Sequence, residues 1–411
     1  MTVTIRRLTG PDEFPAMSRN DMRAFSTDRP MDEIVEAAAR MLGAGGGERV
    51  WVGDDGGEIV SNIGTIPFEL TMPGRRVTPV AGITWVAVSP THRRQGLMRR
   101  GMDAAVADAR ARGETMALLY ASEASIYRRV GFGMATHMRS VAIDVRRTSL
   151  ERRTNSTAAS TARLRYVDTA EAGETLPAIF DRGRPGSPGV ISRHPGWWTH
   201  HVADPPRATD GMSAPFVVVH PDGYVRYRSR ERWIESDPQH LIEIDELLAL
   251  TDDAHTALWG FMLDLDLVSE VVVPRFALDD PLIWRLTNPR ALRTTAVNDA
   301  IWVRVLDTAA ALSARRYATR SEVVLEIVGG GPRVAGRWHL DGGPDHAACS
   351  SSRGEVDITL DAADLGSIVL GGVSPEALRR AGRVAEHRPG ESARLAAMFA
   401  SDPLPFCTTA F

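Results

Sequence analysis

The sequence predicts an α+β fold made of two similar strand-and-helix regions and a third, different region. Strand and helix patterns alternate through residues 1–150. A matching order of strand, turn, strand, helix and strand returns between Phe216 and Val273. Beyond Val297, strand patterns precede short helical ones. A duplicated domain explains the repeat, and a coincidental alternation of strands and helices is the alternative.

The composition excludes several classes of protein. The 411 residues suffice for two to four domains of about 100–200 residues. With 48 basic and 52 acidic residues the net charge is −4, which argues against a nucleic-acid partner. No apolar run reaches the roughly 20 residues of a membrane span, and no export signal begins the chain, so we expect a cytoplasmic protein, with unconventional secretion left open. Every basic residue is arginine, which excludes lysine chemistry, and two cysteines are too few for a disulfide framework or a cysteine metal site.

The first region opens with a hairpin pattern. Val50–Gly53 and Glu58–Ile66 are strand patterns joined by the turn sequence Asp54–Gly57. A strand pattern at Thr84–Val88 is followed by a helix from Leu97 to Gly113 and a buried strand at Thr115–Ala121. A short helix at Ser122–Val130 comes next, and we expect the strand Val141–Val145 to close this region. Residues 146–162 lack apolar periodicity and are typical of a linker.

An arginine-rich loop between a strand and a helix carries the chemistry of the first region. The uncapped N–H groups of a first helical turn attract anions, and Gly96 lets a ligand approach the backbone closely. Arg93, Arg94 and Arg99 add donors suited to a pyrophosphate. We therefore expect a phosphorylated cofactor here. At the matching place in the second region, Asp252 and Asp253 would repel an anion, so that copy has lost the site.

The third region has strand patterns and short helices, followed by an apolar tail. The strands are expected at Ile301–Leu306, Val323–Val328, Gly336–Leu340 and Glu355–Leu360, and the helices at Asp361–Leu370, Pro375–Gly382 and Arg394–Ala400. The tail, residues 401–411, contains two prolines and several apolar residues. We expect it to dock in an extended form on another part of the protein.

Two motifs of the first region resemble those of the GNAT superfamily of N-acetyltransferases. Arg93–Met98 resembles its acetyl-CoA pyrophosphate loop, Q/R-x-x-G-x-G/A, with Met98 in place of the last small residue. Tyr127, Gly131 and Phe132 resemble its Y-x-x-x-G-F segment. The resemblance implies that Tyr127 protonates the departing thiolate, and a phenol with a pKa of about 10 is protonated at neutral pH. A packing role for Tyr127 is the alternative.

The whole chain is similar to the Eis (enhanced intracellular survival) family, most specifically in Val86–Arg100 and Ala121–Gly133. This resemblance implies two tandem GNAT-like domains, each a mixed sheet flanked by helices, and a sterol-carrier-protein-2-like α+β domain. The first GNAT-like domain, with the acetyl-CoA site, is expected at residues 1–150. The second, degenerate one is expected at 151–295, and the sterol-carrier-protein-2-like domain at 296–411. The resemblance also implies a homohexamer built as a dimer of trimers. The implied reaction is acetyl transfer to amines of aminoglycosides, other cationic antibiotics or polyamines, and it needs no metal.

The same resemblance assigns roles to residues. The expected cofactor-binding residues are Val86, Ala87 and Val88 at the pantetheine, Arg93, Arg94, Gln95, Gly96, Leu97, Met98 and Arg99 at the phosphates, and Ser122 and Glu123 at the end of the next strand. The α-carboxylate of Phe411 is expected to act as the base, through water.

Residues for the acceptor are expected from their charge and aromaticity. Asp28 and Asp402 are candidates for selecting polycations, and Phe25, Trp85 and Trp198 for an aromatic wall. Solvated carboxylates and core packing are the alternatives. The histidines have no metal-ligand spacing.

Two other functions stay open from the sequence. The same fold could acetylate lysine or N-terminal amines of proteins or peptides, which would favour a shallow groove. Alternatively, the third domain could make the chain a lipid-binding module, which requires a continuous apolar tunnel.

Overall fold

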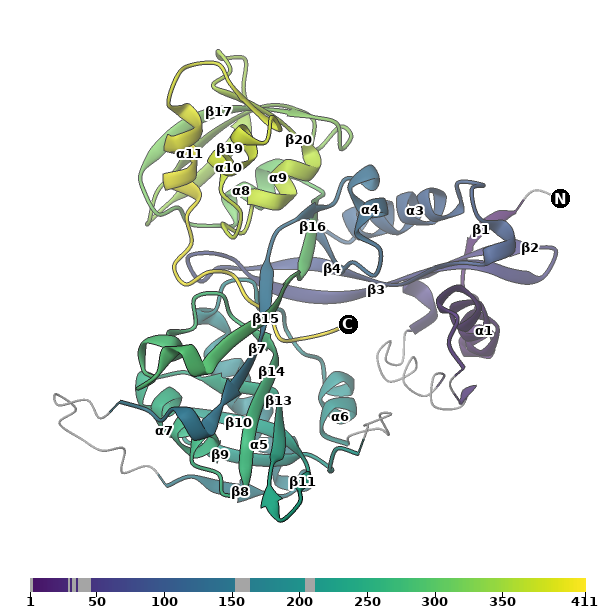
Figure 1. Ribbon diagram of the computed structural model, residues 1–411. Coiled ribbons are helices and arrows are strands. Elements are labelled where there is room, and N and C mark those ends of the chain that lie inside the picture. Colours follow the sequence, from purple (N-terminus) through teal and green to yellow (C-terminus); the bar gives the residue numbers. More distant parts are fainter. Residues whose placement is uncertain (1–2, 29, 32–34, 36–45, 152–162, 204–210) are drawn as a thin grey trace. The chain divides into compact units, whose positions relative to one another are not determined.

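The computed structural model describes residues 3–28, 30–31, 35, 46–151, 163–203 and 211–411, which form two compact units (Figure 1). The first unit comprises Met1–Thr136, Gly186–Trp197 and Asp299–Phe411, and the second comprises His137–Pro185 and Trp198–Asn298. The first and third sequence regions are therefore joined in one unit. Part of the expected linker, residues 152–162, lies outside the described residues.

A seven-stranded sheet in the order β1-β2-β3-β4-β5-β16-β6 forms the centre of the first unit. Its strands are Thr4–Arg7 (β1), Val50–Asp55 (β2), Glu58–Thr71 (β3), Val77–Val88 (β4), Met116–Tyr120 (β5), Gly133–Met134 (β6) and Ile301–Val305 (β16). The helices and short 3-10 turns with it are Pro11–Glu13 (η1), Phe14–Phe25 (α1), Gly46–Arg49 (η2), Pro90–His92 (η3), Leu97–Ala111 (α3), Ala124–Tyr127 (α4) and Arg128–Val130 (η4). The hairpin predicted around Asp54–Gly57 is confirmed, with a β3 strand longer than expected.

Two strands belong to other sheets than the sequence order predicts. Val141–Val145 was expected to close the first region, but β7 (His137–Asp144) pairs antiparallel with β14 (Val268–Phe276) in the second unit. Conversely, Ile301–Leu306 was expected in the third region, but β16 pairs with β5 and β6 in the first sheet. These expectations were wrong because a strand pattern records burial and alternation, and these do not identify the neighbouring strand.

The second unit contains another seven-stranded sheet, in the order β15-β7-β14-β13-β10-β9-β8. Its remaining strands are Arg165–Val167 (β8), Phe216–His220 (β9), Gly223–Arg230 (β10), His240–Ala249 (β13) and Leu292–Asp299 (β15), with a separate hairpin of Trp233–Ile234 (β11) and Asp237–Pro238 (β12). The helices and turns are Val145–Arg147 (η5), Thr169–Gly183 (α5), Arg184–Gly186 (η6), Pro195–Ala203 (α6), which ends in this unit, Asp252–Leu263 (α7), Pro281–Trp284 (η7) and Pro289–Ala291 (η8). The predicted strand–turn–strand repeat corresponds to β9 and β10.

The C-terminal part of the first unit has a five-stranded sheet in the order β19-β18-β17-β20-β21. Its strands are Ser321–Val328 (β17), Gly336–Gly342 (β18), Ala347–Ser351 (β19), Ile358–Asp361 (β20) and Val384–Glu386 (β21). Its helices are Thr308–Ser313 (α8), Ala362–Ile368 (α9), Pro375–Arg380 (α10) and Glu391–Phe399 (α11). One apolar cluster joins this part to the first sheet, because it contains Leu118 and Ile301 as well as Leu325 and Leu395. These α+β elements confirm the predicted fold class.

Candidate active site

The parallel strands β4 and β5 part in the middle of the first sheet. Their pairing begins at Val80 with Met116 and ends at Gly82 with Leu118. Beyond Gly82, β4 continues to Val88, and among the described strands only β3 pairs with this part of it. The backbone groups of Val86, Ala87 and Val88 that face away from β3 are therefore free to bind an extended ligand such as pantetheine.

A bulge at Trp85 bends β4 next to this opening. The pairing of β3 with β4 shifts between Asn62 and Gly64, and Trp85 has a φ of 48°. Such an angle is unusual for a bulky residue and needs support from its surroundings. Asn62 Nδ2 donates to the Trp85 carbonyl at 2.7 Å. At Gly64, a Cβ atom would stand only 2.5 Å from the Trp85 ring, so a glycine is required there.

The predicted anion loop leads from β4 into the first turn of α3. Gly96 immediately precedes α3 with a φ of 73°, Arg94 has a φ of 64°, and no side chain caps the helix. A Cβ atom at Gly96 would meet nothing within 4 Å, so the space in front of the helix is open. Arg93, Arg94, Gln95 and Arg99 are exposed, whereas Leu97 is buried and Met98 partly buried. The uncapped N–H groups and exposed guanidinium groups thus suit a pyrophosphate.

Tyr127 ends α4 and is 3% exposed. Its ring meets Phe132 edge-on, with centroids 6.2 Å apart. Burial raises the pKa of Tyr127 above its usual value, and a hydrogen bond with Ser122 acts in the opposite direction. The phenol therefore keeps its proton throughout the neutral range and can donate it. Ser122 and Glu123, just before α4, are exposed.

The predicted docking of the tail is confirmed. Cys407 and Thr409 are 2% and 0% exposed. Arg193 Nε donates to Thr409 Oγ1 at 2.8 Å, and Trp197 Nε1 donates to the Ala410 carbonyl at 2.8 Å. Arg193 also lies over the ring of Trp197, with its guanidinium carbon 4.0 Å from the ring centroid. The last residues are thus held by several polar contacts.

The ring of Phe411 lies where β4 and β5 part. Its centroid is 5.0 Å from that of Phe68 on β3 and 5.4 Å from that of Tyr120 on β5. A Cβ atom at Gly82 would come within 2.9 Å of the Phe411 ring. Gly82 is the last position of β4 that pairs with β5, so the ring sits at the closed end of the opening.

Tyr127 and Phe411 approach this opening from opposite faces of the sheet. Tyr127 belongs to the apolar cluster of Ala81, Ile83 and Leu119, whereas Phe411 contacts Tyr120 and lies next to Gly82. Neighbouring residues of a strand point to opposite faces of the sheet. Ala81, Ile83 and Leu119 therefore lie on one face, and Gly82 and Tyr120 on the other. A ligand that lies between the strands would therefore have Tyr127 on one side and Phe411 on the other.

Sequence reasoning missed a polar cluster beside the bulge. Asn62 Nδ2 also donates to Asp21 Oδ1 at 2.9 Å, and Asn20 Nδ2 donates to Asn62 Oδ1 at 2.6 Å. Asn20 and Asn62 are each 1% exposed. Burial raises the pKa of Asp21 to about 6, against the opposing effect of the hydrogen bond from Asn62. Asn62 is one of several polar residues of β3, so the sequence pattern alone did not single it out.

The other expected acceptor residues are dispersed. Phe25, at the end of α1, is 48% exposed, and Asp28 and Asp402 are exposed. Trp198 lies in the second unit, where it is 6% exposed and packs edge-on against Phe180. Trp85 is thus the one of these five that lies directly beside the opening, and the acceptor roles stay predictions.

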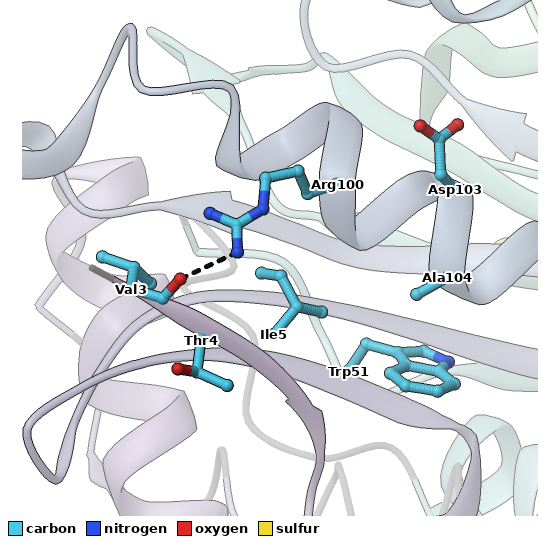
Figure 2. Close-up of a pocket in the computed structure, with 7 residues that line it drawn as sticks. All are labelled: Val3, Thr4, Ile5, Trp51, Arg100, Asp103 and Ala104. Carbon is cyan, nitrogen blue, oxygen red and sulfur yellow. Dashed lines mark hydrogen bonds between the residues drawn. The ribbon is translucent and has the colours of Figure 1, made fainter.

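A hollow of about 510 Å³ lies apart from these residues, between α3 and the first two strands (Figure 2). Arg100 and Asp103 line it from α3, and Val3 and Trp51 from the other side. Arg100 Nη2 already donates to the Val3 carbonyl at 2.8 Å. The guanidinium group of Arg100 is therefore already engaged at the edge of this hollow.

The corresponding loop of the second unit is closed to anions. Thr251 caps α7 by accepting a hydrogen bond from the Ala254 N–H at 3.2 Å. Asp252 and Asp253 occupy the first turn, and Asp252 pairs with Arg285 at 2.7 Å. The first-turn donors that are open in α3 are thus capped and surrounded by carboxylates in α7.

The described residues contain neither a membrane-spanning helix nor a cluster of metal-binding side chains. No helix among them is both long and apolar enough to cross a bilayer. No group of three or more histidine, cysteine, aspartate or glutamate side chains among them could hold a metal ion.

Comparisons with known proteins match every part of the chain. Residues 4–135 and 189–305 each match an acetyltransferase (GNAT) domain family, and residues 308–408 match a sterol carrier protein domain. An uncharacterized N-acetyltransferase of Streptomyces avermitilis is 37% identical over 100% of both chains. The N-acetyltransferase Eis of Mycobacterium tuberculosis is 33% identical over 98% of both. The crystal structure of Eis1 from Mycobacterium abscessus covers 100% of both chains with 34% identity and a TM-score of 0.87. With such identity over its full length, the chain belongs to the Eis family of GNAT enzymes and transfers acetyl groups from acetyl-CoA.

Proposed function

We propose that this enzyme acetylates amines of cationic acceptors, namely aminoglycosides, other cationic antibiotics or polyamines. The observation that carries the proposal is the contact of the Phe411 ring with the closed end of the opening between β4 and β5. A carboxylate at this end of the chain brings negative charge to the side of the sheet where an ammonium group would enter. Asp21 adds a second carboxylate close to Trp85.

In this proposal, acetyl-CoA binds to the first unit alone. Arg93, Arg94 and Arg99, together with the open first turn of α3, hold its phosphates. The unpaired edge of Val86–Val88 holds the pantetheine by backbone hydrogen bonds, and Gln95, Met98, Ser122 and Glu123 line its path. When bound, acetyl-CoA supplies an activated acetyl thioester.

Tyr127 serves as the acid. Its raised pKa keeps the phenol protonated, and its position in the cluster of Ala81 and Ile83 brings it to one face of the opening. The phenol donates its proton to the thiolate that leaves, which makes the thiol a better leaving group.

The α-carboxylate of Phe411 serves as the base, through water. The acceptor amine must lose a proton to become a nucleophile, and a carboxylate is a weak base in water. Its main contribution is to attract the ammonium form and to accept the proton once the amine attacks. Hydrogen bonds to Thr409 and Ala410 hold the two residues before Phe411 in place.

A turnover screen tests the proposal. Acetyl-CoA consumption is measured with aminoglycosides, polyamines and lysine-containing peptides as acceptors. Turnover of the aminoglycosides or polyamines supports the proposal, and turnover restricted to the peptides would favour a protein or peptide acetyltransferase instead.

A variant extended by a few residues after Phe411 should lose most of its activity while binding acetyl-CoA normally. Full activity of that variant contradicts the role of the carboxylate.

The proposal includes a homohexamer, a dimer of trimers, located in the cytoplasm. It also retains the domain bounds 1–150, 151–295 and 296–411. Light scattering of the purified enzyme measures the size of the assembly.

A further inference from the structure

The cluster of Asn20, Asp21 and Asn62 lies next to the opening and has no part in the acid–base steps above. Asn62 Nδ2 joins two oxygens, Asp21 Oδ1 at 2.9 Å and the Trp85 carbonyl at 2.7 Å. Asn20 fixes the orientation of this amide by donating to its Oδ1 at 2.6 Å. Through Asn62, the Asp21 carboxylate is therefore held beside the bulge.

Asp21 carries a charge that its described surroundings do not neutralise. Asn62, a neutral amide, is its hydrogen-bond partner, and no arginine or histidine within the described part of the chain forms an ion pair with it. Asn20 Oδ1, 1% exposed, also has no hydrogen-bond partner among the described side chains and backbone groups. Asp21 is partly buried, and removing an ionised carboxylate from water without a counter-charge is costly, a cost that a cationic ligand would reduce.

Two aromatic residues accompany this carboxylate. Phe25 follows Asp21 by one helical turn on the same face of α1 and is 48% exposed. Trp85, whose carbonyl shares the Asn62 amide with Asp21, is partly exposed. Aromatic faces attract ammonium groups as carboxylates do, so these two residues add to the suitability of this region for a cation.

The cluster and the end of the chain lie on one face of the first sheet. Phe68 lies six positions after Asn62 on β3, an even offset, so their side chains point to the same side. Phe68 contacts the Phe411 ring. An extended acceptor that approaches this face can therefore meet both carboxylates.

We propose that Asp21 binds a second ammonium group of the acceptor, one that is not acetylated in that turnover. The reacting amine must lose its proton, whereas a neighbouring carboxylate favours the protonated form. Asp21 thus suits a non-reacting cation, and Asn20 and Asn62 act as positioning residues. This inference rests on the proposed function, and it narrows the acceptor class to molecules with at least two amino groups.

The test compares Asp21→Asn with the wild-type enzyme and with Asp12→Asn. Asp12 is an exposed aspartate in the turn before α1, so its variant makes the same chemical change away from the cluster. The acceptors are cadaverine and spermidine, with n-pentylamine as a monoamine of matched length. In Asp21→Asn we expect the KM for both polyamines to rise about tenfold or more, with little change in the KM for n-pentylamine or acetyl-CoA. Asp12→Asn should behave as the wild type.

Calorimetry separates this inference from the proposed function. Each amine is titrated into enzyme saturated with coenzyme A, where no transfer takes place. Polyamine binding that Asp21→Asn weakens supports the inference even if no amine is acetylated. Equal polyamine binding by wild type and Asp21→Asn, or no saturable binding by the wild type, overturns it. Circular dichroism and the KM for acetyl-CoA verify that the variant is folded.

Discussion

The hydroxyl of Tyr120 donates a hydrogen bond to the carbonyl oxygen of Thr409, at 3.0 Å. Tyr120 is the last residue of β5, and its ring also packs edge-on against Phe411. One side chain therefore connects the end of the chain to the strand that borders the opening, by a polar and an apolar contact.

We expect Tyr120→Phe to lower kcat while the KM for acetyl-CoA stays unchanged. The ring contact remains, but the tail loses the hydrogen bond, which is worth about 1 kcal/mol. A less firmly held Phe411 spends less time in the reactive position. Steady-state kinetics measure the change in kcat, and thermal unfolding measures the loss of stability that follows from the missing hydrogen bond. Tyr166→Phe, at an exposed tyrosine of the second unit, is the control and should leave kcat unchanged. An unaltered kcat in Tyr120→Phe would show that this anchor has no role in catalysis.

Tyr127→Phe should lower kcat by about 10²–10⁴, the usual range for the loss of a general acid. The ring and its contact with Phe132 are kept, so the fold should be retained. Calorimetry should find unchanged binding of acetyl-CoA. A variant with wild-type turnover would leave Tyr127 with a packing role only.

Gly96→Ala should weaken acetyl-CoA binding. A Cβ atom at Gly96 meets nothing within 4 Å, so any effect arises from the φ of 73° and from the ligand's need for close approach. Gly113, after the other end of α3, has a φ of 80° and equally open space. Both alanine variants should lose about 1 kcal/mol of stability. Only Gly96→Ala should raise the KM for acetyl-CoA, and an equal rise in Gly113→Ala would contradict the assignment of the loop.

The stability of the enzyme should depend on pH through Asp21. Its pKa is raised to about 6 in the folded protein, whereas aspartate in an unfolded chain has a pKa of about 3.9. The folded state therefore holds this proton more tightly, and stability falls as the pH rises from about 4 to about 6. Asp21→Asn removes this loss and should be more stable than the wild type by about 2–3 kcal/mol at pH 7. Chemical denaturation at several pH values measures the difference, which should vanish near pH 4. A constant difference over the whole range would contradict the raised pKa.

Local features of the site could be predicted from the sequence. The loop around Gly96 follows from a glycine at a strand-to-helix junction, and α3 begins at Leu97 as its apolar spacing indicates. The docking of the tail follows from its apolar residues, and its residue Cys407 is buried in the structure. Such features depend on neighbours in the chain, which periodicity and capping rules describe well.

Long-range pairing could not be predicted in the same way. β16 lies between β5 and β6, although more than 160 residues separate it from either strand along the chain. The link between Asp21 and Asn62 likewise joins a helix to a strand 41 residues away. Nothing in the pattern of either segment specifies its partner, because the same burial can be satisfied by several neighbours.

The position of β16 also affects how the protein must be synthesised and dissected. β5 is bordered by β4 and β16, so until residues 301–305 have left the ribosome, one edge of β5 has no partner. A recombinant fragment of residues 1–150 would keep that edge exposed, and open strand edges promote aggregation. The sheet of the first unit therefore cannot be completed before translation of the second unit is complete, and proteolytic removal of the C-terminal region would withdraw a central strand from it.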